Sequence, residues 1–284
     1  MTDNRPAPKP RKYPQLWQAY LLWEELMLMR QRHTLRLSAI EAGKSNLDDT
    51  FERGIMEGRL TVTYANGKVK KYEMFNAARV LREVEKVMIG FGQQHPVWEW
   101  MTSIKGLGAG SQAAKVLAMI DDIDKFDSIA KLWRYCGYGL YEYYTEDGKV
   151  QAPKDGKKRI GEGEDRRSVA HETTPKDGWQ IETVRDRAIA KWVLPYNKAL
   201  KSALFIVGDQ FIKQQTPYYA ELYYAEKQRQ RTLYPEPVKV NGRTMYTDMH
   251  IHRRAMRKMI KEFLKNLWVE WRQAEGLPTS EAWS

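Results

Sequence analysis

Cysteine and long apolar stretches are what this 284-residue sequence has least of. Its single cysteine, Cys136, has no second cysteine to pair with, which excludes an internal disulfide and a zinc site built from several cysteines. No run of about 18 apolar residues occurs, and the first residues, MTDNRPAPKPRKYP, lack the apolar core of a signal peptide. We therefore expect a cytoplasmic protein that does not enter a membrane.

Carboxylates are also scarce relative to basic side chains. The sequence has 36 Asp and Glu against 47 Lys and Arg, a formal net charge of +11. Such an excess favours a polyanionic partner, above all nucleic acid, over an acidic small molecule. Ribosomes and membrane surfaces attract the same charge, but an aromatic content of 12%, with 10 Trp, favours a structured binding protein over a basic tail. The alternative is a charge that only keeps the protein soluble.

The apolar residues of the first third recur mostly at helical spacing, which predicts a mainly α fold. One helix is expected from Gln15 to about Ala42, with Gly43 as its stop, and another over 75–91. Between them, alternating residues on both sides of Asn66-Gly67 predict a small β-hairpin.

The rest of the chain is expected to be helical around one long loop. Helices are predicted over 129–135, 181–193, 195–214 and 249–274, and residues 138–144 alternate as in a strand. Polar residues with many Gly and Pro follow, which predicts a mobile loop. The predicted organisation begins with a basic flexible arm (1–14) and a region of helix, β-hairpin and helix (15–97). A helix-hairpin-helix domain (98–274) that contains the mobile loop (145–180) follows, and a tail (275–284) ends the chain.

The segment WMTSIKGLGAGSQAAKVLAMIDD predicts a helix-hairpin-helix that grips the DNA backbone. Gly106 and Gly108 can adopt backbone angles that other residues avoid, while Leu107 anchors the turn. Amides at the start of the next helix then face a phosphate, a contact that is independent of base sequence. The alternative is an ordinary glycine-rich turn. The DNA-binding residues predicted in this segment are Gly106, Gly108, Ala109, Gly110, Ser111 and Lys115.

Basic residues flank the apolar stripe of the last predicted helix. An excess of one sign over four turns favours phosphate contact, with a solvated face as the alternative. The DNA-binding residues predicted on this helix are Arg253, Arg254, Arg257, Lys258 and Lys261. The acidic cluster Asp121, Asp122, Asp124 and Asp127 is more typical of helix caps than of a metal site, so no metal or cofactor is expected.

The stretch IKGLGAGSQAAKVLAMIDDIDKFDSIAKLWRYCGY resembles the C-terminal domain of insertion-sequence transposases of the 110/116/902 type. That domain runs from a helix-hairpin-helix through an acidic turn and a Phe to a short helix ending in Gly. The similarity resumes at PYNKALKSAL, residues 195–204, and continues through Pro217-Tyr218-Tyr219 and Leu222-Tyr223 to the helix that contains His252, Ala255 and Trp268. The resemblance implies a DNA-binding protein of a mobile-element or recombination context, of prokaryotic, phage or mobile-element origin.

The resemblance also implies two catalytic elements from which this sequence departs. Family members carry a ribonuclease-H-like domain with acidic metal ligands, whereas residues 1–98 show no strands that present carboxylates. The family serine nucleophile would fall near Tyr144-Thr145-Glu146-Asp147-Gly148, which leaves Thr145 and Ser168 as catalytic candidates. We expect no intrinsic catalysis. The alternatives are an active transposase or serine-type recombinase, and a protein-interaction or structural module.

DNA is the expected partner. A guide RNA, a partner subunit that supplies catalytic carboxylates, and a second copy of this chain are further candidate partners.

Thr145→Ala and Ser168→Ala should each leave DNA affinity unchanged, because a nucleophile contributes little to uniform phosphate contacts. Mobility-shift titration of both variants checks this. Strand cleavage by the wild type that either substitution abolishes would instead favour the recombinase.

Overall fold

The computed structural model describes residues 10–45, 49–73, 76–139, 141–146, 149–153, 157–160, 167–170, 180–184, 196–240 and 243–279. The fold is mainly helical, as the sequence predicts. Contacts divide the chain into an N-terminal unit, within 1–99 and 109–122, and a C-terminal unit, within 100–108 and 123–284. The division runs through the segment predicted as one helix-hairpin-helix, because its second helix packs with the N-terminal helices.

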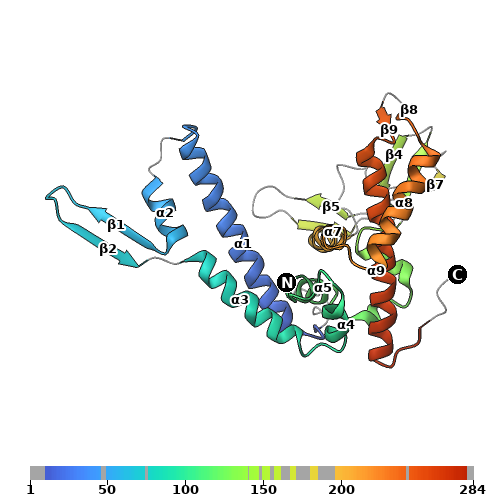
Figure 1. The fold of residues 1–284 in the computed structure, drawn as a ribbon, viewed down its shortest axis with the longest axis horizontal. Coiled ribbons are helices and arrows are strands. Elements are labelled where there is room, and N and C mark those ends of the chain that lie inside the picture. Colours follow the sequence, from blue (N-terminus) through green and yellow to red (C-terminus); the bar gives the residue numbers. More distant parts are fainter. Residues whose placement is uncertain are drawn as a thin grey trace, which may run out of the picture. The chain divides into compact units, whose positions relative to one another are not determined.

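The N-terminal unit is built on two long helices that run side by side, α1 (Pro14–Glu41) and α3 (Ala77–Gly92) (Figure 1). Leu26 of α1 packs with Leu81 and Val84 of α3. Helix α2 (Asp49–Glu57) follows α1, and α4 (Trp98–Ser103) follows α3. Helix α5 (Ser111–Ile120) is buried from Ala113 to its end, since its small and apolar residues pack on α1 and α3. The predicted first helix and its glycine stop are confirmed: Gly43 follows α1 with φ +65°.

The predicted β-hairpin is confirmed as the antiparallel pair β1 (Arg59–Thr63) and β2 (Val69–Glu73). The Tyr64 N–H donates to the Lys68 carbonyl at 2.9 Å, so three residues rather than two form the loop. Gly67 supplies the left-handed conformation, with φ +77°. This is the geometry expected of a three-residue loop that ends in a glycine.

The start of the chain was expected to be a flexible arm up to residue 14. Residues 1–9 lie outside the described residues, but the described part of the arm is fixed. The Lys12 N–H donates to Asp121 Oδ1 at 3.1 Å, and the guanidinium of Arg11 lies 3.6 Å from the centre of the Trp17 ring. The flexible-arm prediction is therefore wrong for residues 10–14, because a buried carboxylate and an aromatic ring hold them.

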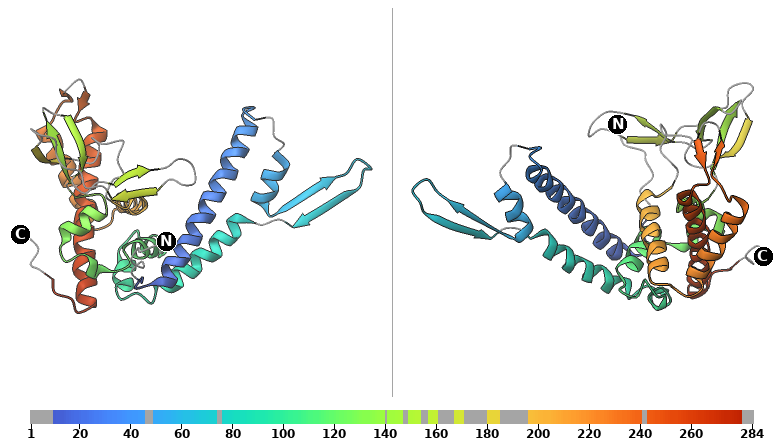
Figure 2. Two further views of the ribbon diagram at one scale, coloured as in Figure 1. Left: turned by 180° about the vertical axis from the view of Figure 1, so that it is seen from behind. Right: turned by 45° about the horizontal axis from the view of Figure 1, so that its top comes forward.

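The C-terminal unit packs around α9 (Asp248–Ala274), whose apolar stripe from Ile251 to Trp271 is buried. Helices α7 (Lys198–Lys213) and α8 (Tyr219–Leu233) lie against it (Figure 2). Phe211 and Tyr219 stack with ring centres 4.8 Å apart, and Phe263 meets both rings edge-on. The remaining short elements of this core are η1 (Ile123–Lys125), α6 (Ile129–Tyr135), β8 (Val238–Val240) and β9 (Arg243–Met245).

Indole and guanidinium donors tie α9 to the acidic turn before α6. Trp268 Nε1 donates to the Phe126 carbonyl at 2.7 Å, and Arg272 lies beside the same oxygen. Arg272 Nε also donates to the Pro278 carbonyl at 2.7 Å. The described part of the predicted tail, residues 275–279, is therefore held against α9, while residues 280–284 lie outside the described residues.

The predicted mobile loop 145–180 is wrong where the structure describes it, since these residues form strands. The elements are β3 (Tyr141–Glu146), β4 (Lys149–Pro153), β5 (Lys157–Ile160), β6 (Arg167–Ala170) and β7 (Gln180–Val184). Strand β3 lies between β4 and β7, and β5 pairs with β6. The charged composition concealed short runs of β-branched and aromatic residues, which suit antiparallel strands.

The helix predicted over 181–193 is also wrong at its start, because residues 181–184 belong to β7 and pair with β3. Residues 185–195 lie outside the described residues. Among the described helices, none combines the length and the apolar character that a membrane crossing needs.

His95 makes the stability of the N-terminal unit depend on pH. Its ring is 3% exposed and lies 4.4 Å from that of Tyr13. Burial, reinforced by the positive charge of Lys12, lowers the pKa of His95 to about 3. The unfolded chain therefore takes up a proton near pH 6.5 that the folded unit does not, so stability falls as pH falls below about 6.5.

We expect the free energy of unfolding to fall by about 2 kcal/mol between roughly pH 7.5 and pH 5 through this histidine. His95→Gln should remove that part of the pH dependence. Urea denaturation at both pH values measures it, and an equal loss in the variant would contradict the assignment.

Candidate nucleic-acid interface

The glycine turn after α4 differs from its predicted geometry. Gly106 has φ +100°, and the next left-handed glycine is Gly110, with φ +80°, rather than Gly108. Leu107 is buried, as expected, and its N–H donates to the Ile104 carbonyl at 2.9 Å. The turn is therefore wider than predicted, because it needs left-handed backbone only at its two ends.

The N-terminus of α5 already faces a carboxylate of the protein. The Ser111 hydroxyl donates to Glu85 of α3, and the ammonium of Lys115 lies 3.8 Å from the same carboxylate. Lys115 is 6% exposed and lies 3.6 Å from the centre of the Trp23 ring. Burial lowers the pKa of Lys115, an effect that Glu85 opposes.

Lys115 is thus wrongly predicted as a phosphate contact, because its ammonium points into the N-terminal unit. Ser111 is likewise engaged with Glu85, and Gly110 is buried beneath Trp98. Gly106 is half-buried, and Gly108 and Ala109 are exposed, so a backbone contact with phosphate stays a prediction for these three residues.

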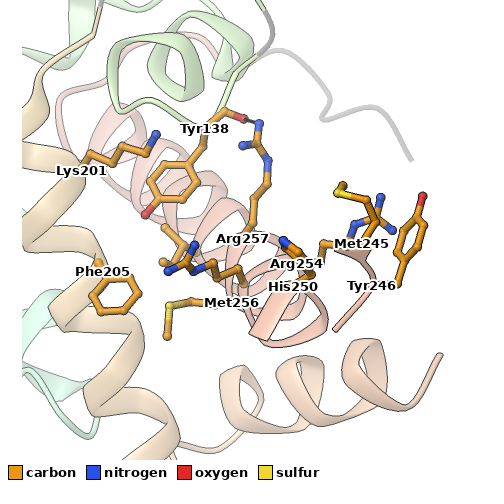
Figure 3. A pocket seen from close by; sticks show the side chains of 11 residues that line it. Tyr138, Lys201, Phe205, Met245, Tyr246, His250, Arg254, Met256 and Arg257 are labelled. Carbon is orange, nitrogen blue, oxygen red and sulfur yellow. Dashed lines mark hydrogen bonds between the residues drawn. The ribbon is translucent and has the colours of Figure 1, made fainter. Parts of the chain in front are cut away.

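The basic residues of α9 line two cavities in the C-terminal unit, and two of them, Arg254 and Arg257, line both. One cavity, of about 480 Å³, contains Arg253 and is named the cationic cavity (Figure 3). None of the described residues that line it is acidic. Its lining comes from α9, α7, β9 and the turn after α6: Tyr138, Lys201, Phe205, Met245, Tyr246, His250, Arg253, Arg254, Met256, Arg257 and Ile260.

Two of these guanidinium groups are held by neutral acceptors. Arg257 donates from Nη2 to the carbonyls of Tyr138 and Gly139, at 2.5 and 3.0 Å (Figure 3). Arg254 donates from Nη1 to the Gln230 amide oxygen at 2.7 Å and lies 4.9 Å from the centre of the Tyr246 ring. These acceptors are neutral groups, and they fix the direction of each guanidinium.

Arg253 and Lys201 complete the positive lining. Arg253 is exposed on α9, and no ion pair of Arg253 occurs among the described residues. Lys201 projects from α7 and lies 4.5 Å from the centre of the Tyr196 ring. One turn further along α7, Phe205 lines the same cavity with 48% of its side chain exposed. Four cations and an exposed ring thus border one space.

The opposite flank of α9 is neutralised. Glu226 of α8 is 5% exposed and accepts from Lys258 at 3.0 Å and from Arg229 at 2.7 and 2.8 Å. Hydrogen bonds from Arg229, Gln230 and Lys258 lower the pKa of Glu226 to about 2, against the opposing effect of its burial. Glu226 and Glu262 line the second cavity, of about 500 Å³.

Lys261, on the same flank, lies 3.6 Å from the centre of the Trp133 ring, and burial lowers its pKa. Of the five basic residues predicted on α9, the structure therefore places Arg253, Arg254 and Arg257 around the cationic cavity. It pairs Lys258 with a carboxylate and packs Lys261 on an indole.

The two catalytic candidates lie on different sheets. Thr145 pairs with Val150 and Gln180 in the sheet β4-β3-β7, while Ser168 pairs with Arg159 in the sheet β5-β6. Within the described ranges, no three His, Cys, Asp or Glu side chains are arranged to hold a metal ion.

Sequence reasoning missed Lys201, Phe205 and Tyr246 as lining residues. Lys201 and Phe205 are four residues apart, a spacing that places them on one helix face, but that spacing alone does not reveal which helix lies opposite.

The two glycines of the turn should respond differently to alanine. A Cβ at Gly110 would lie 3.0 Å from the Trp98 ring in a left-handed backbone, whereas a Cβ at Gly108 would lie 3.5 Å from the Thr102 carbonyl. Gly110→Ala should therefore reduce the free energy of unfolding by about 1–3 kcal/mol, and Gly108→Ala by less than about 0.5 kcal/mol. Equal urea midpoints for the two variants would contradict this geometry.

Comparison with known proteins adds no relative to this picture: no protein-family model, curated protein or solved structure matches the chain.

Proposed function

We propose that this protein binds nucleic acid, with the cationic cavity as the site that takes the phosphate backbone. The observation that carries the proposal is the composition of the cavity lining, in which Lys201, Arg253, Arg254 and Arg257 meet without a carboxylate among the described lining residues. The net charge of +11 supports the same class of partner.

The geometry of the arginines favours phosphate over an unspecific anion. A guanidinium is planar and donates two parallel hydrogen bonds, which match two oxygens of one phosphate. Arg254 and Arg257 are held by Gln230 and by backbone carbonyls, so less side-chain freedom is lost on binding. Arg253 is exposed and contributes its charge from the mouth of the cavity.

The exposed Phe205 ring supports a ligand that combines phosphate with aromatic bases. A base that stacks on an aromatic side chain contributes about 1–3 kcal/mol regardless of its identity. Phosphate contacts and stacking both tolerate any sequence, so the proposed binding is largely independent of sequence.

The biological context is part of the proposal and follows from the resemblance to insertion-sequence transposases. In this proposal the protein acts in the cytoplasm on mobile DNA or during recombination, as a binding protein without its own catalytic centre. Any strand cleavage would then come from a partner subunit, with a guide RNA or a second copy of the chain as further components. An active recombinase remains the alternative, and a covalent protein–DNA adduct on a suicide substrate would support it.

The double variant Lys201→Gln/Arg253→Gln tests the cavity. Removing one phosphate-binding cation should flatten the log-log dependence of affinity on salt by about 0.9, so the slope should fall by about 2 units on duplex DNA. Affinity for single-stranded DNA should fall as well. Fluorescence anisotropy at several KCl concentrations measures both.

The matched control is Lys131→Gln/Lys213→Gln, which removes two exposed lysines of the same unit that pair with Asp127 and Asp209. The control should change the slope by less than about 0.5 units. Equal slopes for the cavity variant and the control, with both folded by circular dichroism, would overturn the proposed site. Absence of any binding by the wild type would overturn the function.

A further inference from the structure

The β1–β2 hairpin is exposed on one face and partly buried on the other. Only Leu60, Val62 and Tyr72 are half-buried among its strand residues, and the others are exposed. The hairpin extends away from α2 and α3 (Figures 1 and 2). An isolated two-stranded hairpin is marginally stable in water. A ribbon of this kind that projects into solvent is suited to contact with another molecule.

The root of the hairpin is fixed by its neighbours. Gly58 ends α2 with φ +79°, and its N–H donates to the Gly54 carbonyl at 2.8 Å. Asn76 caps α3 by accepting from the Arg79 N–H at 2.8 Å, while its amide donates to the Glu57 carbonyl at 3.2 Å. The same asparagine thus joins the end of α2 to the start of α3, so the ribbon is held in a defined direction within its unit.

The hairpin carries far more positive than negative charge. Residues 59–73 contain four basic side chains and one acidic side chain, a net charge of +3. Lys68, Lys70 and Lys71 are exposed, and no ion pair of these three lysines occurs among the described residues. This distinguishes them from Lys258 and Lys115, which lie beside carboxylates.

The register distributes the lysines over both faces. Lys71 lies opposite Thr61 and Lys70 opposite Val62, so neighbouring lysines project to opposite sides. The ammonium of Lys70 lies 4.9 Å from the centre of the Tyr72 ring, and the Tyr64 and Tyr72 hydroxyls lie 2.5 Å apart. Lys70 therefore shares a face with Tyr64, Tyr72 and the half-buried Leu60 and Val62, and the other face combines Lys71 with threonines.

We infer that this hairpin enters the major groove of duplex DNA and contacts phosphates on both walls of the groove. The major groove of B-form DNA, about 12 Å wide, admits a two-stranded ribbon, whereas the deep, narrow major groove of A-form RNA does not. Lysines on both faces match a groove with phosphates on both sides. A protein partner is disfavoured because the exposed strand residues are mainly Lys and Thr, with little exposed apolar surface beyond Tyr64 and Val69.

The inference rests on the proposed function in that DNA is the partner, but it places a second contact in the other unit of the chain. The test is the full-length triple variant Lys68→Gln/Lys70→Gln/Lys71→Gln, in which the three lysines lose their charge. On duplex DNA the log-log salt slope should fall by about 2–3 units. Affinity for single-stranded DNA should stay within about 2-fold of the wild type, because a single strand offers no groove.

The control Lys44→Gln/Arg82→Gln/Lys86→Gln removes three exposed cations of the same unit, one from the turn after α1 and two from α3, and should leave both affinities nearly unchanged. A duplex whose major groove is filled by glucosylated 5-hydroxymethylcytosine provides a second readout. It should bind the wild type at least ~10-fold more weakly than plain duplex and should bind the triple variant with little difference.

An unaltered duplex slope in a folded triple variant would overturn the inference and leave the hairpin as a protein-binding element. Equal binding of plain and glucosylated duplex by the wild type would overturn it too. In both cases the proposed function stands if Lys201→Gln/Arg253→Gln still weakens binding. If the cavity variant loses binding while the hairpin variant does not, the inference about the hairpin fails and the proposed function stands.

Discussion

Burial of one side of α9 is the constraint on which the C-terminal unit depends. Met259, Phe263, Leu267 and Trp271 recur at intervals of four residues and are fully buried. Because a helix turns once per 3.6 residues, this stripe fixes the direction of every other side chain on α9. Arg253 is thereby directed to the cationic cavity and Lys258 to the second cavity, while Arg254 and Arg257 line both. Rotation of α9 about its axis would expose this stripe and redirect the basic side chains, so the two cavities would lose their different linings.

Glu226 determines which of the basic side chains near it are already neutralised within the protein. Its carboxylate is buried with hydrogen bonds from Lys258, Arg229 and Gln230, and removal of a buried charged partner leaves the remaining charges uncompensated. Gln230 in turn accepts from Arg254, which lines both cavities. Glu226 thus neutralises Lys258 and Arg229 and, through Gln230, helps to orient the guanidinium of Arg254 between the two cavities.

Structural features that depend on residues close together in the sequence could be predicted from the sequence. The long first helix, its glycine stop and the Asn66-Gly67 hairpin depend on local patterns, and the structure reproduces them. The alternation of residues 138–144 predicted most of β3, whereas β4–β7 were missed because their charged composition is also that of a loop. Lys115 was misjudged because its environment is made by Trp23 and Glu85, which come from other helices. The cationic cavity was incompletely foreseen for the same reason, since Lys201 comes from α7.

The basic residues of this chain therefore differ in what they can contribute to binding, although each adds the same charge to the net total. Lys115 and Lys258 stabilise the fold beside carboxylates, so their charges are already compensated. Arg254 and Arg257 are oriented by neutral acceptors, so both guanidinium groups are held in a defined geometry. Lys68 and Lys70 are solvated at the ends of long side chains, which suits long-range attraction of a polyanion. In the proposed complex, attraction would come first from the hairpin and geometric selection of phosphate from the arginines, because only the latter are oriented before binding.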